Sequence, residues 1–357
     1  MPSRHADIDS PVAVVAPARL HLGFVDLNGG LGRSFGSIGL AIDGMDVRVW
    51  ARPAERCDVR GADPARVVPI LERVCARYAP GRAVDVLVEQ RAPAHAGLGS
   101  GTQLALAVAD AAARALGVTA GARELAALAG RGLRSGIGIG AFEGGGFLVD
   151  GGRGPASTTP PLIARLAFPA AWRCVLLFDD HLAGLSGQRE RAAFAELPRM
   201  SEADAATLSR VVLVGLLPAL AEADFDAFSR SVATVQAAVG DYFAPAQGGR
   251  YTSSRVGAML EGLARESGLP GIGQSSWGPT GFIFAPDAAQ AAAVAAAIDA
   301  RKADGLRCQI VTGNNTGARH AACSATDDTH PGAGPVQFIR SNDKDTDDER
   351  SVSAARL

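Results

Sequence analysis

The chain has 357 residues, of which 47% are hydrophobic and 20% charged, so it can bury a core and form two globular units. Its formal net charge of −2 excludes a general attraction to nucleic acid or to an anionic membrane, and favours a small-molecule partner. Five cysteines without a Cys-x-x-Cys pair exclude a disulfide framework. We expect a cytoplasmic protein without a targeting or membrane-spanning segment.

The first half of the chain predicts a sheet followed by helices. Alternating or β-branched runs predict strands at 12–15, 37–42, 47–50 and 84–89. A helical period follows at 103–116 and 123–133, and "GGGFLVDGG" at 144–152 returns to strand and turn. We expect residues 1–158 to form an amino-terminal unit of mixed α and β structure.

The second half predicts an α+β sandwich. A strand is expected at 172–178, and helices at 204–242 and 252–266. The strands "GFIFAP" at 281–286 and "LRCQIVT" at 306–312 lie on either side of a helical stretch at 287–302. We expect this unit to cover 159–323, and the polar stretch 324–357 to be a disordered tail.

A glycine-rich loop stands directly before the helical stretch that starts near residue 103. The sequence reads "PAHAGLGSGTQLALAVADAAARAL" from Pro93 to Leu116. Glycines let backbone amides approach a ligand, and the first amides of a helix have no partner within the helix. The loop therefore predicts a phosphate cradle, with a tight strand-to-helix turn as the alternative. Its candidate residues are Gly97, Leu98, Gly99, Ser100, Gly101 and Thr102.

This loop resembles the phosphate loop of the GHMP kinase superfamily, which includes galactokinase, homoserine kinase and mevalonate kinase. Four further segments resemble one branch of that superfamily, the β-ribofuranosylaminobenzene 5'-phosphate synthases. They read "ARLHLGFVDLNGGLGRSFGSIGLAID", "RSGIGIGAFEGGGFLVDGG", "GLSGQRERAAF" and "GIGQSSWGPTGFIF", in that order along the chain. The resemblance spans about residues 12 to 320.

The resemblance implies both a fold and a reaction. The fold is mixed α+β, with an amino-terminal domain like the second domain of ribosomal protein S5 and a ferredoxin-like carboxyl-terminal sandwich. The reaction joins 5-phosphoribosyl 1-diphosphate to 4-aminobenzoate or 4-hydroxybenzoate, with release of carbon dioxide and diphosphate, in tetrahydromethanopterin biosynthesis. The resemblance also implies a homodimer. The alternative is an ATP-dependent small-molecule kinase of the GHMP type.

The amino-terminal segment carries a second group of candidate residues. Arg19 and His21 are two residues apart, so both face the same side of an extended strand, and Asp26 follows on a glycine-rich loop. We interpret these three as catalytic; the alternatives are surface ion pairs and a buried structural histidine. Arginine binds phosphate and carboxylate groups with two parallel hydrogen bonds. Further candidates for binding the substrate anions are Arg33, Arg134 and Ser135.

A third motif, "GQSSWGPT", lies near the carboxyl end of the second unit. Trp277 offers a surface on which an aromatic acid can stack, although a tryptophan before a strand is also typical of a core. The side chains around it can hydrogen-bond to sugar or phosphate. These candidates are Gln274, Ser275, Ser276 and Thr280.

Carboxylates are candidates for charge stabilisation and for binding Mg²⁺. Glu143 follows the phosphate loop roughly where the related kinases carry a catalytic acid, so we interpret it as catalytic. Mg²⁺ is expected with the diphosphate substrate, and Asp26 and Glu143 are its candidate ligands. Asp179 and Asp180 form another acidic pair, which we interpret as a solvated pair at the end of a strand.

Overall fold

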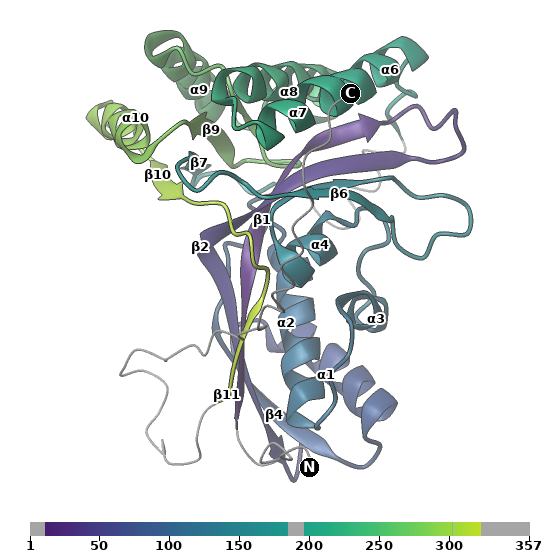
Figure 1. Ribbon diagram of the computed structural model, residues 1–357. Coiled ribbons are helices and arrows are strands. Elements are labelled where there is room, and N and C mark those ends of the chain that lie inside the picture. The colour runs from purple at the N-terminus through teal and green to yellow at the C-terminus, as the bar shows by residue number, and fades with distance from the viewer. Residues whose placement is uncertain (1–10, 185–195, 302, 323–357) are drawn as a thin grey trace, which may run out of the picture.

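The computed structural model describes residues 11–184, 196–301 and 303–322. The described strands form two sheets, one of seven strands and one of four, and helices cover both (Figure 1). Cys323, the expected tail at 324–357 and almost all of the segment "GLSGQRERAAF" lie outside the described residues.

The seven-stranded sheet is built around two long strands. Its strand order is β11-β1-β2-β4-β3, and β5 pairs with both β2 and β6. Only β3 and β4 are parallel; the other pairs are antiparallel, so this is not a doubly wound parallel sheet. The strands are β1 (Val12–Asp26), β2 (Phe35–Ala54), β3 (Asp58–Gly61), β4 (Ala83–Gln90), β5 (Phe147–Asp150), β6 (Leu162–Leu166) and β11 (Arg319–Ala322).

Four helices pack on one face of this sheet: α1 (Pro64–Tyr78), α2 (Ser100–Ala115), α3 (Ala122–Leu128) and α4 (Ile137–Gly144) (Figure 1). α2 is almost wholly buried and contacts β1, β2, α1 and α4. Its many alanines allow this close approach, because small side chains let a helix backbone lie near its neighbours. The start of α2 is thereby held in a fixed place.

The four-stranded sheet has the order β10-β7-β9-β8. Its strands are β7 (Arg173–Asp179), β8 (Ile272–Gln274), β9 (Gly281–Ala285) and β10 (Leu306–Val311). Around it lie α6 (Glu202–Val211), the π-helical turn η1 (Val212–Leu216), α7 (Leu217–Ala221), α8 (Phe225–Gln247), α9 (Ser254–Ser267) and α10 (Ala288–Ala300).

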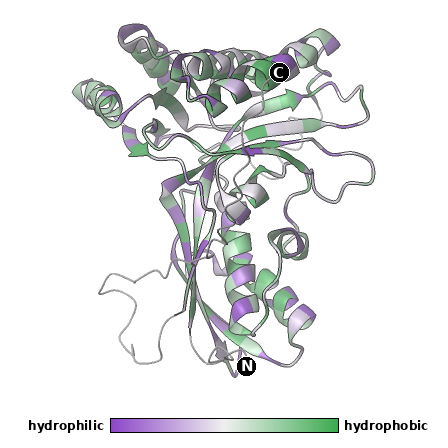
Figure 2. Cartoon of the chain, in the orientation of Figure 1, coloured by the Kyte–Doolittle hydropathy of each residue, from purple (hydrophilic) through white to green (hydrophobic). Residues whose placement is uncertain are grey.

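One apolar core joins the two sheets. Leu20 and Leu22 of β1 belong to the same buried cluster as Phe228 of α8 and Phe282 of β9. Figure 2 shows apolar residues on the strands and helices that meet there. Burial of this shared core fixes the position of β1 relative to the second sheet.

A helical stretch of the second unit has the length and composition of a membrane span. Within the described residues this stretch is Glu202–Ala221, which comprises α6, η1 and α7. Its inner side, with Leu208, Leu216 and Leu220, belongs to the buried core. The stretch is therefore a packed part of the fold.

The structure differs from the sequence-based expectation in several elements. The expected strands at 37–42 and 47–50 are parts of the single strand β2, and the expected helix at 123–133 ends at Leu128. Helices α1 and α4 were not predicted. β6 and β11, from the range expected to form the second unit, pair into the sheet of the first.

Candidate active site

The glycine-rich loop turns directly into a helix, as the sequence predicts. α2 begins at Ser100, and Gly99 before it has a φ of 73°, in the left-handed region that favours glycine. The amides of Thr102 and Gln103 donate to the carbonyl of Gly99, at 3.0 and 3.1 Å. Among the described residues, the amides of Ser100 and Gly101 meet no acceptor, so they are available to an anion.

The loop lies against β1 through Arg19. The Nη1 of Arg19 donates to the carbonyl of Gly97 at 2.7 Å, and its backbone amide donates to the carbonyl of Leu98 at 3.1 Å. A Cβ placed at Gly99 would lie 3.0 Å from the Arg19 side chain. The Arg19 guanidinium is therefore fixed beside the start of α2.

The third motif, "GQSSWGPT" at 273–280, contacts the glycine-rich loop through Ser275. The Oγ of Ser275 donates to the carbonyl of Gly97 at 2.8 Å and accepts from the amide of His21 at 3.0 Å. The amide of Ser276 donates to the carbonyl of His21 at 3.0 Å. A Cβ at Gly97 would lie only 2.2 Å from the Ser275 carbonyl oxygen, so glycine is required for this contact. Three segments far apart in the sequence thus meet at one point.

His21 is a neutral residue in this site. It is only 5% exposed, and burial together with the charges of Arg19 and Arg134 lowers its pKa to about 3. Within the described residues its Nδ1 has no hydrogen-bond partner. The side chain therefore adds no positive charge at neutral pH but keeps an unused polar atom for a ligand.

Trp277 is buried in the protein core. It is 3% exposed, and its ring centroid lies 4.5 Å from that of Phe243 of α8. Both ends of the Gln274 side-chain amide are hydrogen-bonded to protein. Its Nε2 donates to the Ser276 carbonyl at 3.1 Å, and its Oε1 accepts from the amide of Thr252 at 2.7 Å. In this structure the Trp277 ring therefore packs on protein, and its stacking on a substrate stays a prediction.

Thr280 is also buried in the third motif. Its side chain is fully enclosed, and within the described residues its Oγ1 has no hydrogen-bond partner. A buried hydroxyl of this kind can bond to a ligand or to an ordered water.

Helix α4 begins next to the start of α2. The Nε2 of Gln103 donates to the carbonyl of Gly138 at 2.8 Å, and a Cβ at Gly138 would lie 2.9 Å from Cγ2 of Thr102. Arg134 and Ser135 immediately precede α4, and the charge of Arg134 acts on His21. Arg134 thus lies at the predicted site, whereas the Ser135 hydroxyl is bound at the start of α4.

Asp150, for which the sequence predicted no role, holds the start of α4. Its Oδ2 accepts from the Ser135 hydroxyl at 3.0 Å and from the Gly136 amide at 2.8 Å. Its Oδ1 accepts from the amides of Ser37 and Gly152, each at 3.0 Å. Burial raises the pKa of Asp150, and these four hydrogen bonds oppose that rise. The only sequence signal was an acid followed by glycines at the end of a buried strand.

Asp26 and Arg33 lie at another place: Asp26 is the last residue of β1, and Arg33 is on the loop between β1 and β2. The Oδ1 of Asp26 accepts from the amides of Asn28 and Gly29 at 2.6 and 3.0 Å. Arg33 donates to the carbonyls of Gly151 and Gly152, each at 2.7 Å. Both side chains shape the backbone of loops, and among the described residues their hydrogen bonds do not join them to the start of α2.

The other three acidic residues that the sequence singled out, Glu143, Asp179 and Asp180, each pair with an arginine. Glu143 lies in the last turn of α4, away from its start, and its carboxylate is 3.6 Å from Arg165. Asp180 pairs with Arg307 at 3.0 Å. Asp179 is buried at 3% exposure, which corrects the predicted solvated pair; it accepts from Ser253 at 2.7 Å and pairs with Arg255 at 3.4 Å.

The candidate metal ligands do not fit a shared metal centre. Asp26 is bound by amides of its own loop, and Glu143 pairs with an arginine on a different element. In the part of the chain that the structure describes, no group of three or more His, Cys, Asp or Glu residues is placed to hold a metal ion.

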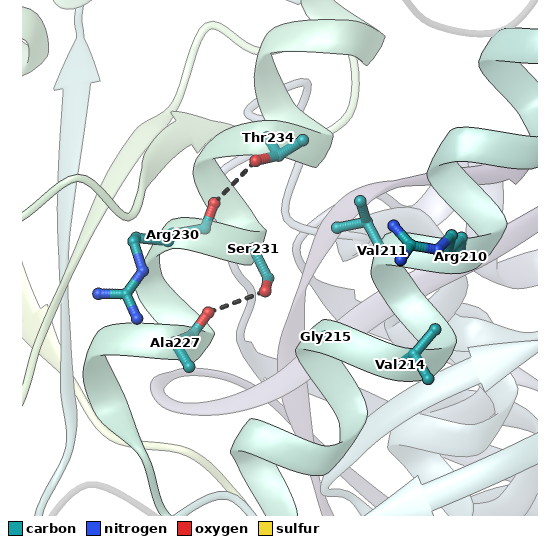
Figure 3. A pocket seen from close by; sticks show the side chains of 8 residues that line it. All are labelled: Arg210, Val211, Val214, Gly215, Ala227, Arg230, Ser231 and Thr234. Atoms are coloured by element: carbon teal, nitrogen blue, oxygen red, sulfur yellow. Dashed lines mark hydrogen bonds between the residues drawn. The ribbon is translucent and has the colours of Figure 1, made fainter.

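A surface hollow of about 300 Å³ lies elsewhere, between α8 and the helices around η1 (Figure 3). The hydroxyls of Ser231 and Thr234 on its wall donate to the carbonyls of Ala227 and Arg230 of their own helix, at 2.8 and 3.0 Å. These polar groups are therefore already used, and the hollow is not part of the site at α2.

Comparison with known proteins defines the class of the fold. The family "GHMP kinases N terminal domain" matches residues 65–145, and "GHMP kinases C terminal" matches residues 216–304. The crystal structure of homoserine kinase from Cytophaga hutchinsonii is similar, with a TM-score of 0.66, 18% identity, and coverage of 90% of this chain and 100% of that one. The chain has the two-domain GHMP kinase fold, which confirms the predicted α+β class.

Two relatives define the family more closely. A "Beta-ribofuranosylphenol 5'-phosphate synthase" of Methanothermobacter thermautotrophicus is 33% identical over 285 residues, which cover 74% of this chain and 85% of that protein. A protein of the same name from Archaeoglobus fulgidus is 36% identical over 233 residues, which cover 62% of this chain and 74% of that protein. The chain belongs to the family of the β-ribofuranosylphenol 5'-phosphate synthases.

Proposed function

We propose that the chain transfers the 5-phosphoribosyl group of 5-phosphoribosyl 1-diphosphate to the ring of a para-substituted benzoate, with loss of diphosphate and carbon dioxide. The observation that carries this proposal is the meeting of three segments at the start of α2. Free amides of Ser100 and Gly101 lie beside the fixed guanidinium of Arg19. This arrangement favours negative charge, such as that of a departing diphosphate.

The reaction needs charge stabilisation more than a protein nucleophile. The C1–O bond of the ribose breaks with its electron pair leaving on diphosphate, and C1 gains positive charge. The ring carbon that bears the carboxylate forms the new bond to C1, pushed by the para substituent. The carboxylate then leaves as carbon dioxide, and its bonding electrons restore the aromatic ring. Cations and amides fixed at the diphosphate lower the barrier to the first step.

The neutral state of His21 agrees with this chemistry. A neutral imidazole next to Arg19 and Arg134 does not repel positive charge that develops at C1, whereas a third cation would. Its unpartnered Nδ1 can bond to a hydroxyl of the ribose or to a substrate carboxylate.

The preferred acceptor is 4-hydroxybenzoate. The names of the relatives contain a phenol, which is the product of losing carbon dioxide from 4-hydroxybenzoate. 4-Aminobenzoate has the same carboxylate and an electron-donating para group, so both acids belong in the test.

Three further features belong to the proposal. Mg²⁺ enters bound to the diphosphate substrate, because the candidate carboxylates do not form a centre of their own. The enzyme acts in the cytoplasm, in keeping with the four free cysteines of the described residues. It works as a homodimer, as the family resemblance implies.

The test is incubation of the protein with Mg²⁺, 5-phosphoribosyl 1-diphosphate and either benzoate carrying a labelled carboxyl group. Labelled carbon dioxide and diphosphate are expected in equal amounts, and each product requires both substrates. Consumption of ATP without release of carbon dioxide would establish the kinase alternative instead. Comparison of kcat/KM for the two acids identifies the acceptor.

A further inference from the structure

Arg131 lies beside the start of α2 on a segment to which the sequence analysis assigned no role. It follows α3, and its backbone amide donates to the Ala126 carbonyl at 2.7 Å, which closes the end of that helix. A Cβ placed at Gly101 would lie 3.9 Å from Nη2 and 4.0 Å from Nη1 of Arg131. Its guanidinium therefore borders the first turn of α2.

No acidic partner balances this guanidinium within the described residues. Arg131 forms no ion pair there, and its buried Nε has no hydrogen-bond partner. The charges that act on it come from Arg66 and Arg73 of α1, and they lower its pKa together with burial. A guanidinium remains protonated at neutral pH, so Arg131 brings a positive charge to the positive end of the α2 dipole, and two exposed arginines of α1 add to the positive potential there.

Such an arrangement is unfavourable unless an anion is bound. Unpaired charges that are partly removed from water cost free energy, and like charges nearby add to that cost. Glu124 of the neighbouring helix α3 does not relieve it, because its carboxylate accepts from Tyr78 at 2.8 Å and lies 3.7 Å from Arg77. Unfavourable electrostatics in a site often reflect a function that needs them.

Arg19 and Arg131 both border the start of α2. Arg19 borders the Cβ position of Gly99, and Arg131 borders that of Gly101. The amides of Ser100 and Gly101, which meet no acceptor within the described residues, belong to the same short stretch of chain. A ligand with two linked phosphate groups offers an anionic group to each guanidinium.

We infer that Arg131 is a second cationic contact for the leaving diphosphate, beside Gly101 in the first turn of α2. This inference rests on the proposed function, and it extends the phosphate cradle beyond the loop. One phosphate of the diphosphate lies at the amides and Arg19, and the other lies at Arg131. The 5'-phosphate of the ribose is bound elsewhere in the site.

The test measures binding of inorganic diphosphate and of ribose 5-phosphate by calorimetry, at fixed Mg²⁺. Arg131→Gln is expected to weaken diphosphate binding by about tenfold to a hundredfold, the effect of losing a charged hydrogen bond. Binding of ribose 5-phosphate is expected to stay within about twofold of wild type on the same reasoning. Arg131→Lys, which keeps the charge, should restore part of the diphosphate affinity.

The matched control is Arg123→Gln, which removes the same charge from the exposed face of α3 and should leave both affinities unchanged. Thermal unfolding without ligand separates binding from a structural role. Removal of an unpaired charge should leave the Tm of Arg131→Gln unchanged or raise it. A lower Tm with equal weakening of both ligands would overturn the inference.

The outcomes also separate this inference from the proposed function. Wild-type diphosphate binding in Arg131→Gln, in an enzyme that releases carbon dioxide, would refute the role of Arg131 alone. Selective loss of diphosphate binding, in a protein that releases no carbon dioxide from either benzoate, would refute the proposed reaction and retain the anion contact. Weakened ribose 5-phosphate binding with intact diphosphate binding would also overturn the assignment.

Discussion

Helices α2 and α4 begin side by side (Figure 1). They differ in whether the protein supplies an acceptor for the backbone amides at the helix start. At α4 a carboxylate of the protein, Asp150, accepts from Gly136 and Ser135. At α2 no acidic side chain lies in the first turn, and the amides of Ser100 and Gly101 meet no acceptor within the described residues. The difference teaches that one helix start is completed by folding and the other is left for a ligand.

Removal of the protein's own anion at α4 should have the largest effect. Asp150→Ala leaves four donors without their acceptor in a buried place, so the free energy of unfolding should fall by about 3 kcal/mol. Urea denaturation at pH 7 measures this loss. Asp150→Asn, which keeps one acceptor oxygen, is the control and should lose less. A loss below about 0.5 kcal/mol for the alanine variant would show that α4 does not depend on this cap.

Giving α2 an anion of its own should make the two helix starts alike. Ser100→Asp places a carboxylate in the first turn, which should stabilise the fold by about 0.5 kcal/mol. The same carboxylate repels diphosphate, so the Kd for 5-phosphoribosyl 1-diphosphate should rise about thirtyfold. Ser100→Asn has the same shape without the charge and should change this Kd much less. Equal affinities of the two variants would contradict an anion site at α2.

The pH dependence of the free energy of unfolding tests whether His21 lies in buried, positively charged surroundings. Its pKa is about 3 in the folded protein and 6.5 in a model compound, so below pH 6.5 only the unfolded chain takes up this proton. Stability should therefore fall as the pH falls, by about 2 kcal/mol from this residue between pH 7 and pH 5. His21→Gln should lack that part of the dependence in urea denaturation at the two pH values. The same slope in both proteins would place the imidazole in a solvated position.

Glu143 should show the smallest effect. Its carboxylate is about half exposed, pairs with Arg165 and lies away from both helix starts. Glu143→Gln should change kcat/KM by less than about threefold, since an exposed ion pair contributes little. Steady-state kinetics with both substrates measures this, with Arg165→Gln as the matched variant. A drop of more than a hundredfold in turnover would restore the catalytic role that the sequence suggested.

The local sequence predicted the glycine-rich loop and the start of α2 well. The glycines before an alanine-rich helical period marked the loop and placed the helix start within a few residues of Ser100. The resemblance to known synthases brought Arg19, His21 and the third motif to the same site, and their hydrogen bonds join these segments. These features depend on backbone chemistry and on short motifs, which are visible in the sequence.

The other features depend on long-range packing. The acceptor role of Asp150 toward Ser37 and Gly136 requires three elements to meet, and no local pattern announces it. The neutrality of His21 follows from burial, from the charge of Arg19 on the same strand and from that of Arg134, which precedes α4. Burial of Trp277 against Phe243 likewise arises from α8, more than thirty residues earlier in the chain. Helix α1 was missed although proline at its first position is a known start signal.

Strand β1 also limits how the site can open. It pairs with β2 along nearly its whole length, and its Leu22 carbonyl accepts from the Gln236 side chain of α8 at 2.6 Å. The Oε1 of Gln236 in turn accepts from the amide of Gln274, in the third motif, at 2.8 Å. A hinge between the two units would have to break the hydrogen bonds through which Gln236 joins β1 to the third motif, so these bonds oppose movement of the two sheets apart at the site.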